Sequence, residues 1–310
     1  MISLVEKFET VKNSRFFLAG GALLCSLLWG SAFPCIRLAH RYFDSGKMIN
    51  HLSFAGIRFT LAGILVLMFL NKKREYWKNC PKKGLIVTSL FQVVFQYTLF
   101  YWGLKLAPAV LGAILVSTGS FWWVLLAPLV DKKESINLKQ FASLVLGFIG
   151  VCVCVFTKDG GGDSSYSGLL FVFSSLCGVV AALLVRPMNK RIPSTFLSGA
   201  SLFLGGVIFC LISIDSTFTL IRNMNIQLFF LTMWLSIVSA AAFSLWYYLI
   251  TLFDVPRLSG YRMLIPVCGV FESVLVLADE KLTWNYLTGG LLVLVSIFYL
   301  EKLKRKCAVS

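Results

Sequence analysis

The chain has 310 residues, of which 58% are hydrophobic and 14% are charged. A soluble domain contains about 45 to 50% apolar and about 25% charged residues, so this composition excludes a soluble globular protein. The formal net charge of +15 would suggest a nucleic-acid partner in a soluble protein, but here the basic residues interrupt long apolar runs. That distribution indicates membrane topology and argues against nucleic-acid binding.

Ten apolar stretches are long enough to cross a bilayer, because one crossing needs about 20 residues. In chain order they are 17–36, 52–70, 84–104, 107–130, 138–157, 166–185, 194–214, 226–250, 257–279 and 282–300. The third and fourth stretches nearly merge, and Pro108 supplies the helix break between them. We therefore predict an all-α integral membrane protein with ten transmembrane helices.

The Lys and Arg residues of the connecting segments predict the orientation. Most of them fall on the side that contains both termini and residues 72–83. Cytoplasmic segments are enriched in Lys and Arg, so we expect both termini in the cytoplasm. The first apolar run is too long for a signal peptide and is expected to stay in the membrane as an anchor. The lipid bilayer is thus the expected surroundings of a multi-pass protein, which we assign to the cell membrane, specifically the bacterial inner membrane.

A Gly/Ser-rich segment at residues 159–165 divides the apolar stretches into two sets of five, with boundaries at 1–158 and 164–310. A shift of 148 positions aligns Gly30 with Gly178 and Pro108 with Pro256. An odd number of crossings in each half makes the second half enter the membrane from the opposite side. The sequence therefore predicts two inverted five-helix repeats, a plan found in many secondary transporters.

Short motifs resemble those of the drug/metabolite transporter superfamily, EamA type. Leu-Trp-Gly-Ser-Ala-Phe-Pro at residues 28–34 is similar to the first-helix signature, and residues 266–283 resemble the end of the ninth helix and the start of the tenth. Lys132-Lys133-Glu134 looks like the first-half counterpart of the latter. The resemblance implies ten helices around a central cavity and export or exchange of small organic metabolites. It does not name the substrate, since members carry amino acids, nucleotide-related compounds and drugs.

Three charged residues fall within apolar stretches: Arg58, Arg262 and Glu272. An unpaired charge in mid-bilayer costs at least about 2.5 to 3.5 kcal/mol, so such residues are candidate functional sites. Arg58 and Glu272 have the same expected depth, about 10 Å below the outer boundary, which suggests either a gate that protonation of Glu272 opens or a static pair. The proton is accordingly the candidate coupling ion. Arg262 lies near a helix end, where it either lines the cavity or extends to the surface.

Neutral polar and aromatic residues supply the other candidates for substrate binding. Gln92 and Gln96 are four residues apart and share one helix face. The remaining candidates are Trp29, Tyr97, Tyr101, Ser117 and Trp122. Aromatic walls with a few hydrogen-bonding groups suit a small organic solute, although contacts between helices would use the same residue types. Residues 246–248, Trp-Tyr-Tyr, are expected to be anchors at the membrane surface rather than lining residues.

The sequence lacks the motifs of metal binding and of phosphate binding. The two histidines, His40 and His51, have no ligand at metal spacing, and the glycines at 160–162 are not followed by the Lys-Ser/Thr of a phosphate-binding loop. We therefore expect no metal, no cofactor and no catalytic residue. The favoured function is a secondary active transporter of a small-molecule metabolite, and the alternatives are a membrane-embedded lipid-modifying enzyme and a channel or scaffold protein.

Overall fold

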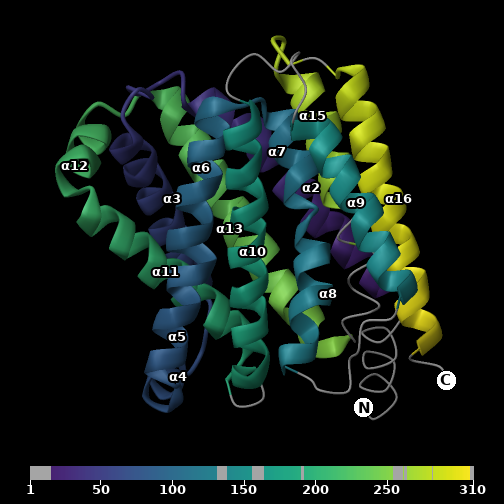
Figure 1. The fold of residues 1–310 in the computed structure, drawn as a ribbon. Helices are drawn as coiled ribbons and strands as arrows, with labels where there is room; N and C mark the ends of the chain where they lie inside the picture. The colour runs from purple at the N-terminus through teal and green to yellow at the C-terminus, as the bar shows by residue number, and fades with distance from the viewer. Residues whose placement is uncertain are drawn as a thin grey trace.

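The computed structural model describes residues 15–130, 138–155, 164–189, 192–253, 261, 264–280 and 282–307. Every regular element in these residues is a helix, and most of the helices run roughly parallel or antiparallel in one bundle (Figure 1). The prediction of an all-helical fold is confirmed for this part of the chain.

The helices of the first half are α2 (Arg15–Ala39), α3 (Met48–Met68), α4 (Lys73–Asn79), α5 (Lys82–Ser89), the π-helical η1 (Leu90–Phe95), α6 (Gln96–Leu106), α7 (Ala109–Val116), α8 (Gly119–Val130) and α9 (Leu138–Val155). Those of the second half are α10 (Ser164–Met188), α11 (Ser194–Ile212), α12 (Ile214–Arg222), α13 (Ile226–Leu252), α15 (Leu264–Val276) and α16 (Trp284–Cys307). The short helices α4 and α12 lie in the connections between apolar stretches.

Six helical segments of the described chain are long and apolar enough to cross a bilayer: Phe16–Ala39, Met48–Met68, Lys82–Leu106, Tyr166–Val185, Ser194–Ile212 and Ile226–Leu252. Shorter apolar helical segments cover Ala109–Trp123, Phe141–Gly150, Leu264–Val276 and Trp284–Ser296. Together these segments coincide with the apolar stretches of the sequence.

The stretch at 107–130 is not one continuous helix, because α7 and α8 are separated by a turn at Ser117 and Thr118. The hydroxyls of these two residues donate to the carbonyls of Ile114 and Leu115 at 2.6 and 2.7 Å. Their backbone N–H groups bond to the same two carbonyls, three residues back. Bonds of this span tighten the turn, and side-chain donors compete with the helical ladder, so the helix breaks here.

A π-helical turn interrupts the long helical segment at residues 82–106, between α5 and α6. Such wide turns inside α-helices occur frequently at functional sites. The turn contains Gln92 and ends immediately before Gln96, and both amides face the interior cavity described below.

The two halves of the chain pack mainly against each other. The most extensive contacts join α3 to α11, α9 to α16, and α2 to α15 and α13. The helices α2 and α10 make corresponding contacts. The helix α2 packs against α13 and α15 of the second half, and α10 packs against α6, α7 and α8 of the first half. The packing is therefore reciprocal, and each half completes its core with helices of the other.

The most extensive helix contact, between α3 and α11, depends on glycines. A Cβ atom on Gly63 would lie 2.4 Å from the backbone nitrogen of Phe203, and one on Gly206 would lie 2.3 Å from that of Thr60. A side chain at either position would collide with backbone atoms, so these glycines allow the two helices to touch.

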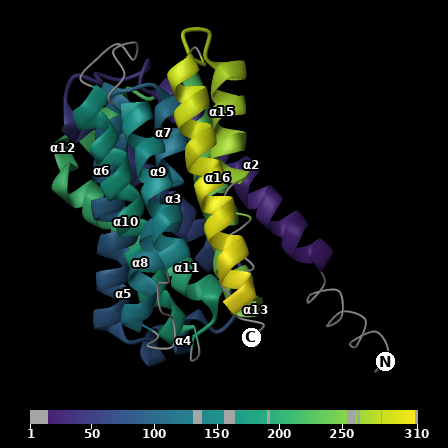
Figure 2. The ribbon, with the colours of Figure 1, turned by 45° about the vertical axis from the view of Figure 1, so that its right-hand side comes forward.

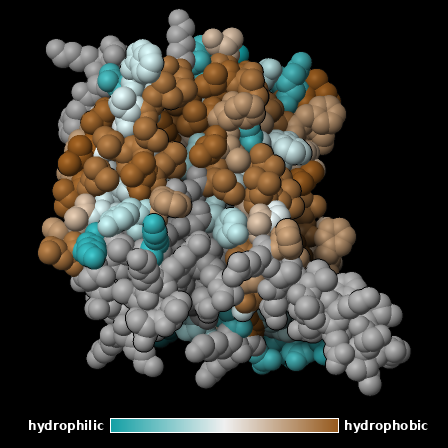
Figure 3. Space-filling model, turned by 90° about the vertical axis from the view of Figure 1, so that its right-hand side faces the viewer, coloured by the Kyte–Doolittle hydropathy of each residue, from teal (hydrophilic) through white to brown (hydrophobic). Residues whose placement is uncertain are grey.

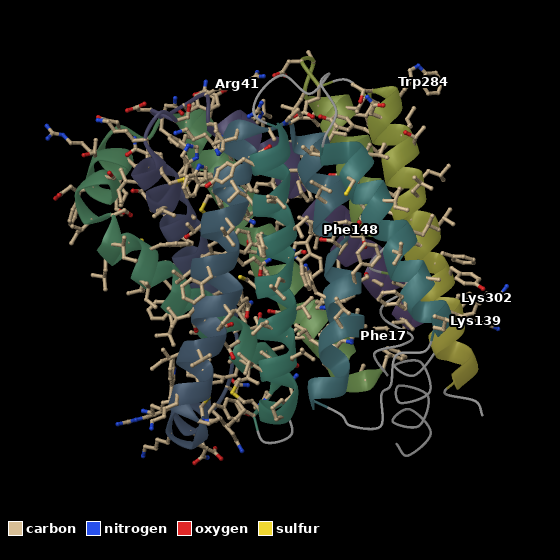
Figure 4. All side chains as sticks on the ribbon, in the orientation of Figure 1. Phe17, Arg41, Lys139, Phe148, Trp284 and Lys302 are labelled. Carbon is tan, nitrogen blue, oxygen red and sulfur yellow. The ribbon has the colours of Figure 1, made fainter. Side chains whose placement is uncertain are left out.

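The bundle has two distinct ends, which we name after the helices α4 and α12 (Figure 1). Basic residues gather at the α4 end on residues 72–83, and Lys139 and Lys302 lie toward the same end (Figure 4). Arg41 and Trp284 lie at the α12 end (Figure 4). The helix α2 starts and α16 finishes toward the α4 end, and the first turns of α2 project away from the other helices (Figure 2).

Candidate functional site

A cavity of about 120 Å³ lies inside the bundle, and helices of both halves line it. Five of the residues that the sequence predicts for substrate binding contribute to its wall: Trp29, Arg58, Gln92, Gln96 and Tyr97. The rest of the wall is predominantly apolar and includes aromatic side chains from α2, α6 and α13. A predominantly apolar cavity with several aromatic side chains and a few polar groups suits a small organic ligand.

Arg58 is the most unusual residue of this wall, because its charged side chain is only 1% exposed. Its Nε donates to the carbonyl of Leu235 at 3.2 Å and to Oγ of Ser239 at 3.1 Å. Its two terminal nitrogens donate to the hydroxyl of Tyr101 at 3.1 Å and to Oγ of Ser239 at 2.9 Å. The guanidinium group also lies over the rings of Phe59 and Tyr97, at 4.8 and 5.7 Å from their centroids.

These contacts orient the Arg58 cation without neutralising it. A guanidinium group has five N–H donors, and one donor on each terminal nitrogen has no partner among the described residues. The partners of Arg58 are neutral oxygens, so its positive charge is not balanced by a carboxylate. A buried cation that keeps one unpaired donor on each terminal nitrogen is suited to bind an anionic group such as a carboxylate.

Glu272 does not pair with Arg58, and the expectation of an ion pair between them is wrong. Equal depth did not bring them together, since α13 and α6 supply the oxygens around Arg58 while Glu272 faces α2. A Cβ atom on Gly30 of α2 would lie 2.9 Å from Oε1 of Glu272. The absent side chain of Gly30 therefore makes room for the carboxyl group between α2 and α15.

Gln92 joins the two halves through its side-chain oxygen. This oxygen accepts hydrogen bonds from the hydroxyl of Tyr247 and, at 3.0 Å, from that of Ser201. Gln96 lies against Gly178 of α10, where a Cβ atom would be 2.9 Å from Oε1. The two amides are thus held by the second half of the chain.

Trp246 and Tyr247 line the cavity, so the expectation that they are surface anchors is wrong. Trp29 packs edge-on against Phe243 and Trp246, with centroid distances of 5.4 and 5.5 Å. The sequence missed this cluster because α13 is apolar on all sides, and its hydrophobic pattern does not distinguish the cavity face from the others.

The other predicted site residues have different positions. Tyr101 supports Arg58 rather than lining the cavity, and Ser117 faces a separate groove on the outside of the bundle. Trp122 donates from its ring nitrogen to the carbonyl of Val172 at 3.0 Å, in a small cluster of α8 and α10 residues. Glu272 is outside the cavity wall, and Arg262 lies outside the described residues.

Polar contacts connect the helices at the α12 end. Arg37 donates to the carbonyl of Leu104 at 2.7 Å, and Nδ1 of His51 lies 3.1 Å from Nε2 of His40. Burial, with the charges of His51 and Arg37 acting in the same direction, lowers the pKa of His40 to about 2. His40 is consequently neutral at physiological pH and adds no charge to this end.

Glu280, in the α15–α16 connection, caps a helix of the other half. Its carboxylate is 8% exposed and accepts from the backbone N–H groups of Ala109 and Val110 at 2.5 and 3.0 Å. These are the first residues of α7, whose preceding Pro108 provides no capping side chain. The carboxylate satisfies two free N–H groups and complements the positive end of the helix dipole.

The described residues contain no group of three or more His, Cys, Asp or Glu side chains that would hold a metal ion.

Comparison with known proteins identifies relatives over nearly the whole chain. Residues 17–156 and 166–301 match the EamA-like transporter family. An uncharacterized transporter of Archaeoglobus fulgidus is 23% identical over 277 residues, which are 87% of this chain and 93% of that protein. A probable amino-acid metabolite efflux pump of Salmonella typhimurium is 25% identical over 296 residues, which are 89% of this chain and 92% of the pump.

A solved crystal structure shows a similar fold. It aligns with a TM-score of 0.61 at 17% identity, over 95% of this chain and 99% of the other.

Proposed function

The chain belongs to the EamA-like transporter family, and on this premise we propose that it is a secondary active transporter that exports or exchanges a small organic metabolite with an anionic group. Membership makes it a multi-pass membrane protein that transports rather than catalyses. The proposed substrate is an amino acid or a nucleotide-related compound, and the carboxylate of an amino acid is the group that fits the site best.

The environment of Arg58 carries this proposal. Its charge is buried in the cavity wall, and its partners Tyr101, Leu235 and Ser239 are neutral, so an anionic ligand would remove the cost of an unpaired cation. The rings of Trp29 and Trp246 would contact the apolar part of the same ligand. The Salmonella typhimurium relative, a probable amino-acid metabolite efflux pump, supports this substrate class.

For the architecture, we propose ten crossings arranged as two inverted five-helix repeats, residues 1–158 and 164–310. The six longer and four shorter apolar segments support the number of crossings. The reciprocal packing of α2 and α10 supports a twofold relation between the halves. The basic α4 end would face the cytoplasm with both termini, and a bacterial inner membrane is the proposed location.

The proton is the proposed coupling ion, and Glu272 is its proposed carrier. The carboxyl group lies between α2 and α15, which both contribute to the cavity wall, and it has no ion-pair partner among the described residues. Protonation is the available way to neutralise such a group inside a bilayer. Movement of α2 against α15 during transport would change its access to water.

Exchange of labelled solutes by the purified protein in liposomes tests the function. We expect saturable, ATP-independent exchange of at least one amino acid or nucleotide-related compound from a library of labelled metabolites. Flux that rises linearly with concentration would indicate a channel, and a folded protein that exchanges no member of the library would contradict the proposal.

A further inference from the structure

A second hollow, which we call the lateral groove, lies on the outer surface of the bundle between α7, α15 and α16. It has a volume of about 430 Å³. Its walls are almost entirely apolar and include Ile114 of α7, Val270 and Val274 of α15, and Gly290 and Leu294 of α16. The hydroxyl of Ser117, at its edge, already donates to the carbonyl of Ile114, so this residue does not require a polar ligand.

The surroundings of the groove are those of a membrane-facing surface. Phe271, Leu275 and Leu291 border it and are largely exposed. Figure 3 shows the side of the molecule on which α16 lies, where hydrophobic side chains cover most of the described surface. The bilayer interior is the natural environment for such a surface, and its acyl chains are the molecules available to fill the groove.

The groove spans most of one leaflet. Along α16 its lining runs from Tyr286 to Leu294, which is about 12 Å at about 1.5 Å per residue. The hydrocarbon core is about 30 Å thick, so the groove covers somewhat less than half of it. Trp284 is 81% exposed at the α12 end, as expected of an aromatic residue at the level of the lipid headgroups.

The inner end of the groove lies close to the central cavity. Val116 and Ile265 line the cavity, while their chain neighbours Ser117 and Pro266 line the groove. Both pairs lie where the α7–α15 contact ends, since α7 finishes at Val116 and α15 starts at Leu264. A molecule in the groove would therefore pack against the two helices that separate it from the substrate site.

We propose that the lateral groove is a binding site for a single acyl chain of a membrane lipid from the leaflet at the α12 end. The headgroup lies near Trp284 and the chain follows α16 inward between α15 and α7, ending beside Ser117. The ligand is apolar within the groove because the groove offers shape and dispersion contacts rather than hydrogen bonds.

The test uses full-length protein in liposomes that contain phosphatidylethanolamine with a photoreactive diazirine in one acyl chain. We expect the cross-linked peptides to concentrate on α15 and α16 residues of the groove. Gly290→Trp should abolish these adducts by filling the groove. Gly290→Ala should retain them, because a Cβ atom there would meet Ile114 carbons at ordinary distances of 3.5 to 3.8 Å.

Two further variants keep the result interpretable. Val270→Trp fills the groove from the opposite wall and should also abolish the adducts. It replaces Gly290→Trp in the test if that variant does not fold. Ala241→Trp, in a separate apolar hollow between α3, α11 and α13, should leave the adducts unchanged. Adducts spread evenly over all lipid-facing helices, or adducts that persist in both filled variants, would overturn the proposal. The measurement requires no transported substrate, so this outcome is independent of the transport function.

Discussion

Arg58 and Ser239 come from different halves of the chain, yet two nitrogens of the arginine, Nε and Nη2, donate to the single Oγ of the serine at 3.1 and 2.9 Å. This contact fixes one edge of the guanidinium group to α13. Each terminal nitrogen keeps one donor without a partner among the described residues, and Arg58 lines the cavity. The contact between the two halves thus orients the guanidinium group of Arg58 in the absence of substrate.

Substitution of Arg58 should weaken binding of an anionic substrate. Charge-assisted hydrogen bonds contribute about 2 to 3 kcal/mol, so Arg58→Gln is expected to raise the Kd by about 30- to 150-fold. Arg58→Lys should also bind weakly, because an ammonium group does not reproduce the planar fork that reaches Tyr101 and Ser239 together. Isothermal titration calorimetry on folded, monodisperse protein measures both effects.

Arg37 is the matched control for this substitution. It is a partly buried arginine that donates to the carbonyl of Leu104 at the α12 end and does not line the cavity. Arg37→Gln should leave the Kd within about a factor of two, which is about 0.4 kcal/mol. If Arg37→Gln and Arg58→Gln weakened binding equally, the weaker binding would reflect general destabilisation and not a role of Arg58 in the site.

Neutralising Glu272 should uncouple transport from the proton gradient. Glu272→Gln preserves the size of the side chain but cannot release a proton, so exchange should continue while its acceleration by a pH gradient disappears. Transport in liposomes with different internal and external pH measures this effect. Asp279→Asn, at an exposed carboxylate of the α12 end, is the control and should behave like the wild type. An unchanged gradient response in Glu272→Gln would exclude this residue as the proton carrier.

Two adjacent carboxylates should differ in their contribution to stability. Glu280→Ala removes a buried cap from α7 and is expected to cost about 1 to 2 kcal/mol. Asp279→Ala removes an ion pair with Arg41 in which the side chains are 58% and 57% exposed, so it should cost at most about 1 kcal/mol. Thermal unfolding in detergent should give the lower melting temperature for Glu280→Ala, and the reverse order would be inconsistent with the capping role.

Close packing of α3 on α11 should make Gly206 intolerant of a methyl group. Gly206→Ala would place Cβ 2.3 Å from the backbone nitrogen of Thr60, and overpacking of this kind costs about 1 to 3 kcal/mol or more. Gly20→Ala is the control, since no atom of another described element lies within 4 Å of its Cβ position. The yield of monodisperse protein and its melting temperature should fall only for Gly206→Ala; comparable values for the two variants would refute the contact.

The sequence predicted the helical fold well because bilayer-length apolar runs form helices almost by necessity. It missed the break between α7 and α8, which depends on local bonds of Ser117 and Thr118 that compete with the helical ladder. The capping role of Glu280 was also hidden. Its partners lie 170 positions or more away in the chain, and no local pattern records such a contact.

The candidate site could be predicted in part. Arg58, Gln92 and Gln96 stand out as polar residues in apolar helices, and all three line the cavity. The sequence did not reveal their partners, and equal depth suggested an Arg58–Glu272 pair that the structure does not contain. Depth fixes only one coordinate of a side chain, while the direction in which it points depends on how each helix is rotated against its neighbours.

Comparison of an amino acid with its carboxamide tests the central claim, that Arg58 recognises an anionic group in the cavity. The two ligands have nearly the same shape and differ in the negative charge. For the amino acid that the liposome screen identifies, the wild type should bind the acid more tightly than the amide by a factor of about 30 or more, and Arg58→Gln should lose most of that preference. Equal affinity of the wild type for acid and amide, or an undiminished preference in Arg58→Gln, would contradict this role of Arg58.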